Sequence, residues 1–197
     1  QKVDLFTFKM SKKTGVLIVN LGTPDSPSTS DVKRYLSEFL NDPRVIDINP
    51  IGRKVLVNGI IVPTRGPKSA KEYKKLFKIG NGASPLLTYG KNLLKLVRKI
   101  GHKQFDVELA MRYGNPSMNS ILEKMRLANY DQIIIFPLYP QYASATTGSI
   151  IEKAFKIISK WWVIPEIKVI GQFYDDFRYL DCVKTVSYTH LRAHETR

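Results

Sequence analysis

The segment from residue 132 to residue 162 most constrains what this chain can fold into, because a buried strand, a polar loop and an amphipathic helix follow one another there. Residues 133–136 are all apolar, which is typical of a strand buried on both faces of a parallel sheet. Beyond the loop, apolar side chains recur at helical spacing, at Ile150, Ile151, Ala154, Phe155, Ile158, Trp161 and Trp162. The segment therefore predicts a strand over residues 132–138 and a helix over residues 147–162.

The loop between this strand and this helix carries more side-chain chemistry than a simple turn needs. It contains two tyrosines and a series of hydroxyl and amide side chains, namely Gln141, Ser144, Thr146, Thr147 and Ser149. In open α/β sheets, ligands bind at the carboxyl ends of the strands, where such loops lie. The end of the loop, residues 146–149, falls at a predicted helix N-terminus, which favours an anion. Capping of the helix by Thr146 or Thr147 is the structural alternative.

Strands and helices alternate along the chain, which indicates an α/β fold with a parallel sheet. Strands are predicted at residues 16–21, 106–111, 132–138 and 167–170, with a short extended piece at 45–48. Helices are predicted at residues 30–40, 67–78, 86–100, 118–128 and 147–162, the first two starting at Ser30 and Pro67. For residues 51–62 the pattern leaves helix and strand both open.

Three of the predicted strands, ending at Leu21, Met111 and Leu138, run into loops rich in Gly, Pro and hydrogen-bonding groups. Because the carboxyl ends of parallel strands meet at one edge of a sheet, we expect these loops to line a common rim. The chain has no Gly-x-Gly-x-x-Gly or Gly-x-x-x-x-Gly-Lys-Ser/Thr pattern, so a nucleotide phosphate is a poor candidate for the ligand.

The loop sequence resembles a known signature. Residues 138–149, LYPQYASATTGS, are similar to the LYPQYS-x-x-TTGS signature of ferrochelatases, the enzymes that insert ferrous iron into protoporphyrin. Four further matches occur in the family's order: GVLIVNLGTP at 15–24, TRGP at 64–67 followed by Tyr73, GASP at 82–85, and MRYGNP at 111–116. The resemblance extends from about Lys12 to about Lys184. Any one motif is weak, but several in order over most of the chain are specific.

The resemblance implies an α/β fold with a Rossmann-like parallel sheet flanked by helices, the first half of a two-domain chelatase fold. It places the N-terminal domain at residues 12–160 and the opening of a second domain at 161–185, with the boundary near 159–165. Residues 1–11 are expected to be a leader or another non-native extension. Residues 186–197 resemble translated cloning sequence and are expected to be a non-native tail. The chain is therefore expected to be an N-terminal fragment of a bacterial-type ferrochelatase.

By the same resemblance, Fe²⁺ and protoporphyrin IX are the substrates, and no resident cofactor is implied. Leu21, Tyr73, Tyr139 and Tyr142 are expected to form apolar walls for the macrocycle. Arg65, Ser84 and Arg112 are expected to anchor its propionates.

Each of these roles has a structural alternative. The tyrosines are also consistent with core packing, Arg112 with a structural ion pair, Arg65 with a solvated loop charge, and Ser84 with a cap for a helix beginning at Pro85.

The residues that would handle the metal are not expected in this chain. In ferrochelatases a histidine, in a Ser-x-His-Gly/Ser-Leu-Pro type motif, and a glutamate from the second half of the protein do this work, and no such motif occurs here. His102 is expected in a surface loop, and His190 and His194 lie in the suspect tail. No residue of this chain is therefore predicted to be catalytic or to bind metal, and the 197-residue chain is expected to insert no iron.

Composition sets looser bounds. The net charge is +14, which suits an acidic membrane surface, a nucleic acid or a dicarboxylate ligand, although scattered lysines most often form a solvated surface. A basic α/β binding module for RNA or another polyanion is the alternative function, but no RNA-binding signature appears. The single cysteine, Cys182, and the lack of any apolar run of roughly 18 to 20 residues favour a cytoplasmic location. The basic charge adds the expectation of peripheral membrane contact.

Overall fold

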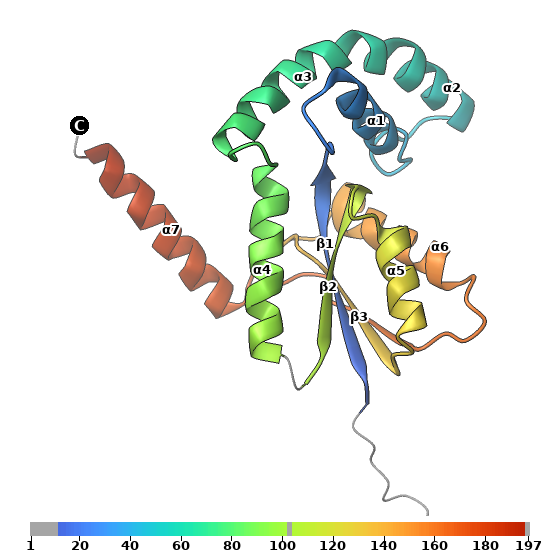
Figure 1. Cartoon of the computed structure of the whole chain (residues 1–197), viewed down its shortest axis with the longest axis vertical. Helices are drawn as coiled ribbons and strands as arrows, with labels where there is room; N and C mark the ends of the chain where they lie inside the picture. Colours follow the sequence, from blue (N-terminus) through green and yellow to red (C-terminus); the bar gives the residue numbers. More distant parts are fainter. Residues whose placement is uncertain (1–11, 102–103, 196–197) are drawn as a thin grey trace, which may run out of the picture.

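The computed structural model describes residues 12–101 and 104–195, and its centre is a four-stranded parallel sheet (Figure 1). The strands are β1 (Thr14–Thr23), β2 (Asp106–Gly114), β3 (Gln132–Pro137) and β4 (Glu166–Val169), in the order β2-β1-β3-β4. Every neighbouring pair is parallel. The predicted α/β fold, with a parallel sheet flanked by helices, is therefore confirmed.

Helices connect the strands and cover the sheet. The helical segments are α1 (Thr29–Leu40), α2 (Pro50–Lys54), the π-helix η1 (Val55–Ile61), α3 (Val62–Ile79), α4 (Pro85–Gly101), α5 (Met118–Leu127), the π-helix η2 (Ser144–Gly148), α6 (Ser149–Ile158) and α7 (Phe177–Glu195). In Figure 1, α1, α2 and α3 form an arch beyond the carboxyl ends of the strands, and α7 projects away from the sheet. Large apolar side chains on α7, such as Phe177 and Leu180, are exposed.

The core has two layers, one on each face of the sheet. On one face, Leu17 and Val19 of β1 pack with buried residues of α5 and α6, among them Leu122 and Ile150. On the other face, Ile18 packs with β2 and with partly buried side chains of α4. Alternate residues of β1 thus point to opposite apolar layers. This is the reason that its sequence is a continuous apolar run rather than an alternating one.

Two helix boundaries differ from the prediction. The side chain of Ser28, not Ser30, caps α1 by accepting the backbone N–H of Asp31 at 3.1 Å. Helix α6 ends at Ile158 instead of continuing to Trp162, because the chain turns there and the Trp161 N–H donates to the Ile158 carbonyl at 2.9 Å. A prediction from apolar spacing alone makes the helix too long, because residues in the turn that follows, such as Trp161, can also pack on the core.

The segment between α1 and α4 was predicted less well. Residues 45–48 form turns and bends rather than an extended piece. Residues 51–62 are helical, in α2, η1 and the first residue of α3. Pro67 lies inside α3 instead of starting a helix. A proline lacks an N–H, so its usual place in a helix is the first turn. Here the π-helix η1 runs directly into α3, so the chain is already helical before it reaches Pro67.

The domain boundary proposed near residues 159–165 is followed by β4, which pairs with β3 in the same sheet. The sheet of the N-terminal domain therefore continues to Val169. The segment proposed as a non-native tail, residues 186–197, is helical up to residue 195, and Tyr188 in it is exposed. The proposed leader, residues 1–11, and His102 lie outside the described residues.

Candidate functional site

The three loops predicted to form a rim do lie at one edge of the sheet. β1, β2 and β3 are parallel neighbours, so their carboxyl ends point the same way. Gly22 of β1 pairs with Tyr113 of β2, and the Leu138 N–H donates to the Val19 carbonyl at 2.7 Å. The prediction that these three loops share one edge of the sheet is therefore confirmed. It is the side of the sheet over which α1, α2 and α3 arch (Figure 1).

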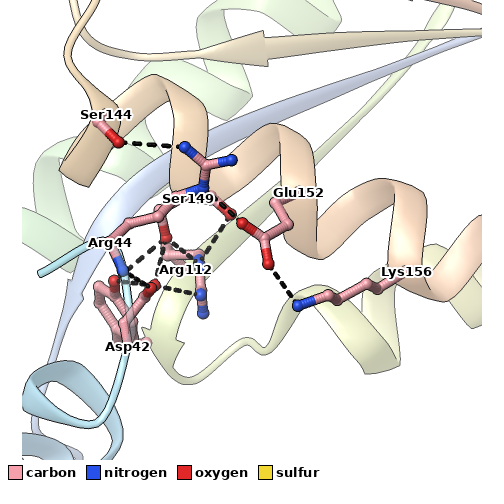
Figure 2. A network of polar contacts seen from close by, with 8 residues as sticks. Asp42, Arg44, Arg112, Ser144, Ser149, Glu152 and Lys156 are labelled. Carbon is pink, nitrogen blue, oxygen red and sulfur yellow. Dashed lines mark hydrogen bonds and ion pairs between the residues drawn. The ribbon is translucent and has the colours of Figure 1, made fainter. Parts of the chain in front are cut away.

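A buried polar network joins three elements at this rim (Figure 2). Asp42, in the segment after α1, accepts hydrogen bonds at Oδ2 from Arg112 Nη2 at 2.5 Å, from the Tyr113 hydroxyl at 2.7 Å and from Ser149 Oγ at 2.5 Å. Its other oxygen accepts the backbone N–H of Arg44 at 2.8 Å. The side chain of Asp42 is only 3% exposed and that of Arg112 is 13% exposed, so the ion pair is shielded from water.

The environment of Asp42 favours its charged form. Burial acts to raise the pKa of the carboxyl, but hydrogen bonds from Ser149, Tyr113 and the Arg44 backbone, with the charge of Arg112, outweigh burial and lower the pKa below its ordinary value. Burial raises the pKa of the Tyr113 hydroxyl, which therefore stays protonated and acts as a donor. The network thus holds Asp42 as a carboxylate beside the guanidinium of Arg112.

The stability of the protein should therefore depend on pH through Asp42. A carboxyl whose pKa is lowered on folding contributes stability above its unfolded pKa of about 3.9, and this contribution disappears as the pH falls through the folded pKa. We expect Asp42→Asn to cost about 3 kcal/mol at pH 7, because it leaves Arg112 without its buried counter-charge. Urea unfolding of both proteins should show this difference shrinking below about pH 4. A difference that is the same at pH 7 and pH 3 would contradict the assignment.

A second ion cluster lies beside the first and ties the same segment to α6 (Figure 2). Arg44 Nε donates to Glu152 at 2.5 Å, and Arg44 Nη1 donates to Ser144 Oγ at 3.1 Å. Glu152 also pairs with Lys156 one turn further along α6. These side chains are partly exposed. They nevertheless connect the backbone next to Asp42 with the start of the helix that carries Ser149.

Aromatic side chains surround the network on the side of α1 and α3. The rings of Phe39 and Tyr113 meet edge to face with centroids 5.1 Å apart, and those of Tyr35 and Tyr73 do so at 6.1 Å. Burial is the main reason that the pKa values of Tyr35 and Tyr73 are raised. The two hydroxyls also interact with each other. The rim therefore combines an aromatic wall with a fixed ion pair.

Five of the predicted porphyrin-contact residues lie at or beside this rim. Arg112 is in the network, and Tyr73 belongs to the aromatic wall. Tyr139 packs against the core beneath the rim, and its hydroxyl is buried without a hydrogen-bond partner in the described part of the chain. Burial raises the pKa of Tyr139 to about 12, although the nearby charge of Arg112 opposes this rise. Leu21 is half-buried near the end of β1, and Tyr142 is exposed, with its hydroxyl close to Gly148.

The other two predicted residues lie outside the network. Arg65 was expected in a loop but is exposed on helix α3, so its solvated charge is on a helix surface. Ser84 is buried directly before α4, where its carbonyl accepts the Thr88 N–H at 3.0 Å. α4 does begin at Pro85, as the capping alternative requires. Within residues 12–101 and 104–195, neither residue makes a hydrogen bond or ion pair with Asp42.

The predicted capping of α6 by threonine was wrong. Residues 144–148 form a π-helix that leads directly into α6, and no side-chain hydrogen bond caps either segment. Thr146 Oγ1 instead donates to the Ala143 carbonyl at 3.3 Å. The Thr147 side chain is buried, and the described residues offer its hydroxyl no partner. The hydroxyl of Ser149 serves the Asp42 network rather than an anion.

Sequence reasoning missed Asp42, Tyr113 and Arg44 as members of the site. Asp42 stands between Asn41 and Pro43, and this triplet indicated only the end of a helix. Nothing local in the sequence shows that the carboxylate reaches Arg112 of β2 and Ser149 of α6, which lie 70 and 107 positions further along. The one available signal was an acidic residue beside a predicted rim that carries an arginine.

A family profile described as Ferrochelatase matches residues 13–197 of the chain. The chain belongs to the ferrochelatase family. Ferrochelatases of Francisella tularensis subsp. tularensis (strain WY96-3418) and subsp. novicida (strain U112) are 41% identical to it over 181 residues. The ferrochelatase of subsp. holarctica (strain FTNF002-00 / FTA) is 43% identical over the same length. Each alignment covers 91% of this chain and 54% of the relative, so the chain spans about half the length of these ferrochelatases.

The membership agrees with the motif resemblance, and the comparisons give no support to the alternative of an RNA-binding module. Within the described residues, no helix is both long enough and apolar enough to cross a membrane.

Proposed function

We propose that this chain forms one wall of the porphyrin-binding cleft of a ferrochelatase, which inserts Fe²⁺ into protoporphyrin IX to give protohaem. The observation that carries the proposal is the convergence of three strand-end loops at one sheet edge, where Arg112 is held beside an aromatic wall. Ligands bind at this edge in open parallel α/β sheets. The ferrochelatase family supplies the class of ligand.

The rim offers the two kinds of contact that a porphyrin dicarboxylate needs. Leu21, Tyr73, Tyr139 and Tyr142 supply apolar and aromatic surface for the flat ring. Arg112 supplies N–H donors for a propionate, since its Nη1 makes no hydrogen bond to any described residue while Nε and Nη2 are engaged. Arg65, on α3, and Ser84, directly before α4, are proposed as further anchors.

The location of the protein belongs to the same proposal. Ile51, Val55 and Ile60 are exposed on α2 and η1, in the arch beyond the sheet edge. Exposed apolar groups on a strongly basic protein suit peripheral contact with an acidic membrane, from which an apolar porphyrin could be taken. The single cysteine, Cys182, suits the cytoplasm. We therefore propose a cytoplasmic protein with membrane-peripheral contact.

Binding of protoporphyrin IX and of its dimethyl ester can be compared to separate the contribution of the carboxylates from that of the apolar ring. We expect the chain to bind protoporphyrin IX more tightly than its dimethyl ester, because only the free acid offers Arg112 a charged carboxylate, and the ester carbonyl is a weaker, neutral acceptor. Arg112→Gln should reduce this preference about tenfold, the value of a charge-assisted hydrogen bond. Fluorescence titration of the four combinations measures the ratio. Because each ratio is taken within one variant, a general loss of stability cancels.

The matched control is Arg98→Gln, since Arg98 lies near the end of α4 and pairs with Glu108 at 3.1 Å, away from the rim. Its preference for the free acid should be unchanged. Equal affinity of the unmodified chain for the acid and the ester would overturn the proposed anchoring.

A further inference from the structure

The strongest unassigned feature of the rim is the set of contacts that hold Arg112 from several sides. Its Nε donates to Ser149 Oγ at 2.7 Å and to the Ser149 carbonyl at 3.2 Å. Its Nη2 donates to Asp42, and its guanidinium carbon lies 4.4 Å from the centroid of the Tyr113 ring. One edge and one face of the guanidinium are thus occupied, and Nη1 is the nitrogen that remains for a ligand.

Asp42 is the residue on which these contacts depend. It accepts from Arg112, from the Ser149 hydroxyl that itself accepts from Arg112, and from the hydroxyl of Tyr113, whose ring lies against the guanidinium. Its second oxygen is fixed by the Arg44 N–H, and Arg44 is itself held to α6 through Glu152. The carboxylate is therefore anchored independently of Arg112 and can set the position of the guanidinium.

We propose that Asp42 is a positioning residue for Arg112, acting on the carboxylate of the substrate only through that arginine. This deepens the proposed function and rests on it. The buried carboxylate neutralises much of the arginine charge, so Arg112 acts through the direction of its remaining N–H groups rather than as a free cation. A flexible surface lysine or arginine has no such preferred direction. Asp42 thereby favours a porphyrin carboxylate that arrives in one orientation.

The test observes the guanidinium directly, by NMR of the 197-residue chain labelled with ¹⁵N-arginine. A clamped Nε–H exchanges slowly with water and gives its own signal, which the Arg112→Lys variant identifies by its absence. In Asp42→Asn we expect exchange of this Nε–H to accelerate about tenfold or more, because a neutral amide replaces the charged acceptor. The matched control is Asp131→Asn, whose carboxylate accepts the Lys13 N–H at 2.7 Å at the opposite edge of the sheet.

Ser149→Ala gives a second variant should Asp42→Asn fail to fold. It removes the hydroxyl that links Arg112 Nε to Asp42, while the Ser149 carbonyl remains as an acceptor. We expect a smaller acceleration, of a few fold. Unchanged Nε–H exchange in both variants, or equal acceleration in Asp131→Asn, would overturn the positioning role.

Addition of protoporphyrin IX and of its dimethyl ester to the same samples links the role to binding. The Arg112 signal should shift with the free acid and not with the ester, and the shift should be lost in Asp42→Asn. A shift with the free acid that persists in Asp42→Asn would overturn the proposal. If the Nε–H is protected by Asp42 but no porphyrin shifts it, the proposed function is what fails, and the clamp on Arg112 then serves the fold alone.

Discussion

Gly22→Ala is expected to destabilise the protein strongly. Gly22 has φ of +114°, which an L-residue with a side chain rarely adopts. A Cβ built on Gly22 would lie 1.8 Å from the Tyr113 carbonyl oxygen, which is backbone and cannot swing away. Relief requires β1 and β2 to separate at the rim. We expect a loss of about 3 to 5 kcal/mol from strain and overpacking together, a large part of the stability of a domain.

Urea unfolding followed by circular dichroism measures this loss. The matched control is Gly52→Ala in α2, where an added Cβ meets nothing within 4 Å. Alanine favours a helix over glycine, so the control should keep or slightly raise the midpoint. If Gly22→Ala unfolds at the same urea concentration as the unmodified chain, the close approach of the two strands at the rim is wrong.

The 197-residue chain alone is expected to form no protohaem from Fe²⁺ and protoporphyrin IX. Insertion needs a base for the pyrrole protons and ligands that take Fe²⁺ from water. By family resemblance, a histidine and a glutamate of the second half supply these groups, and the histidine motif is absent from this sequence. Loss of a general base alone costs on the order of 100-fold or more in rate. The absorbance of protohaem in an anaerobic assay measures the rate.

Joining the chain to the C-terminal half of a relative is expected to give insertion, which would show that this segment is competent. In the restored protein, Arg112→Ala should lower the rate, whereas Arg98→Ala should leave it unchanged. Protohaem formation by the 197-residue chain without the second half would contradict the placement of the chemistry outside this segment.

The architecture was predictable because each of its signals is local. The continuous apolar runs at residues 16–19 and 133–136 indicate strands buried on both faces, and the structure shows their side chains in two opposite apolar layers. The alternation of strands and helices indicates a parallel sheet. From that order alone, the three strand-end loops had to share one edge.

The segment between residues 41 and 67 was predicted poorly because contacts between a side chain and the backbone, which no residue pattern indicates, decide its structure. Arg53, for example, donates from Nη1 to the Ile46 and Ile48 carbonyls at 3.2 and 3.0 Å, which bends residues 45–48 back toward α2. A β-branched sequence such as Val45-Ile46 otherwise suits an extended strand. No residue pattern indicates the π-helix η1 that precedes α3. Without it, Pro67 was expected at the start of a helix rather than inside one.

The candidate site was predictable in outline but not in its polar contacts. Arg112 and the tyrosines follow from motif and strand position. The choice between a propionate anchor and an ion pair for Arg112 depended on Asp42, a residue 70 positions away that sequence spacing does not link to it. The structure shows the ion pair and leaves Nη1 for a ligand, so the two readings are compatible.

The central claim, that a porphyrin binds at the carboxyl edge of the sheet, is tested most directly by backbone amide shifts. Protoporphyrin IX is added in steps to the ¹⁵N-labelled 197-residue chain, and the shifting amides are mapped onto the structure. The account predicts that the largest shifts cluster at the strand-end loops, near Leu21, Arg112 and Tyr139, and on the facing part of α3 near Tyr73. Shifts concentrated instead at the amino edge of the sheet, near Asp131 and Trp162, would contradict it.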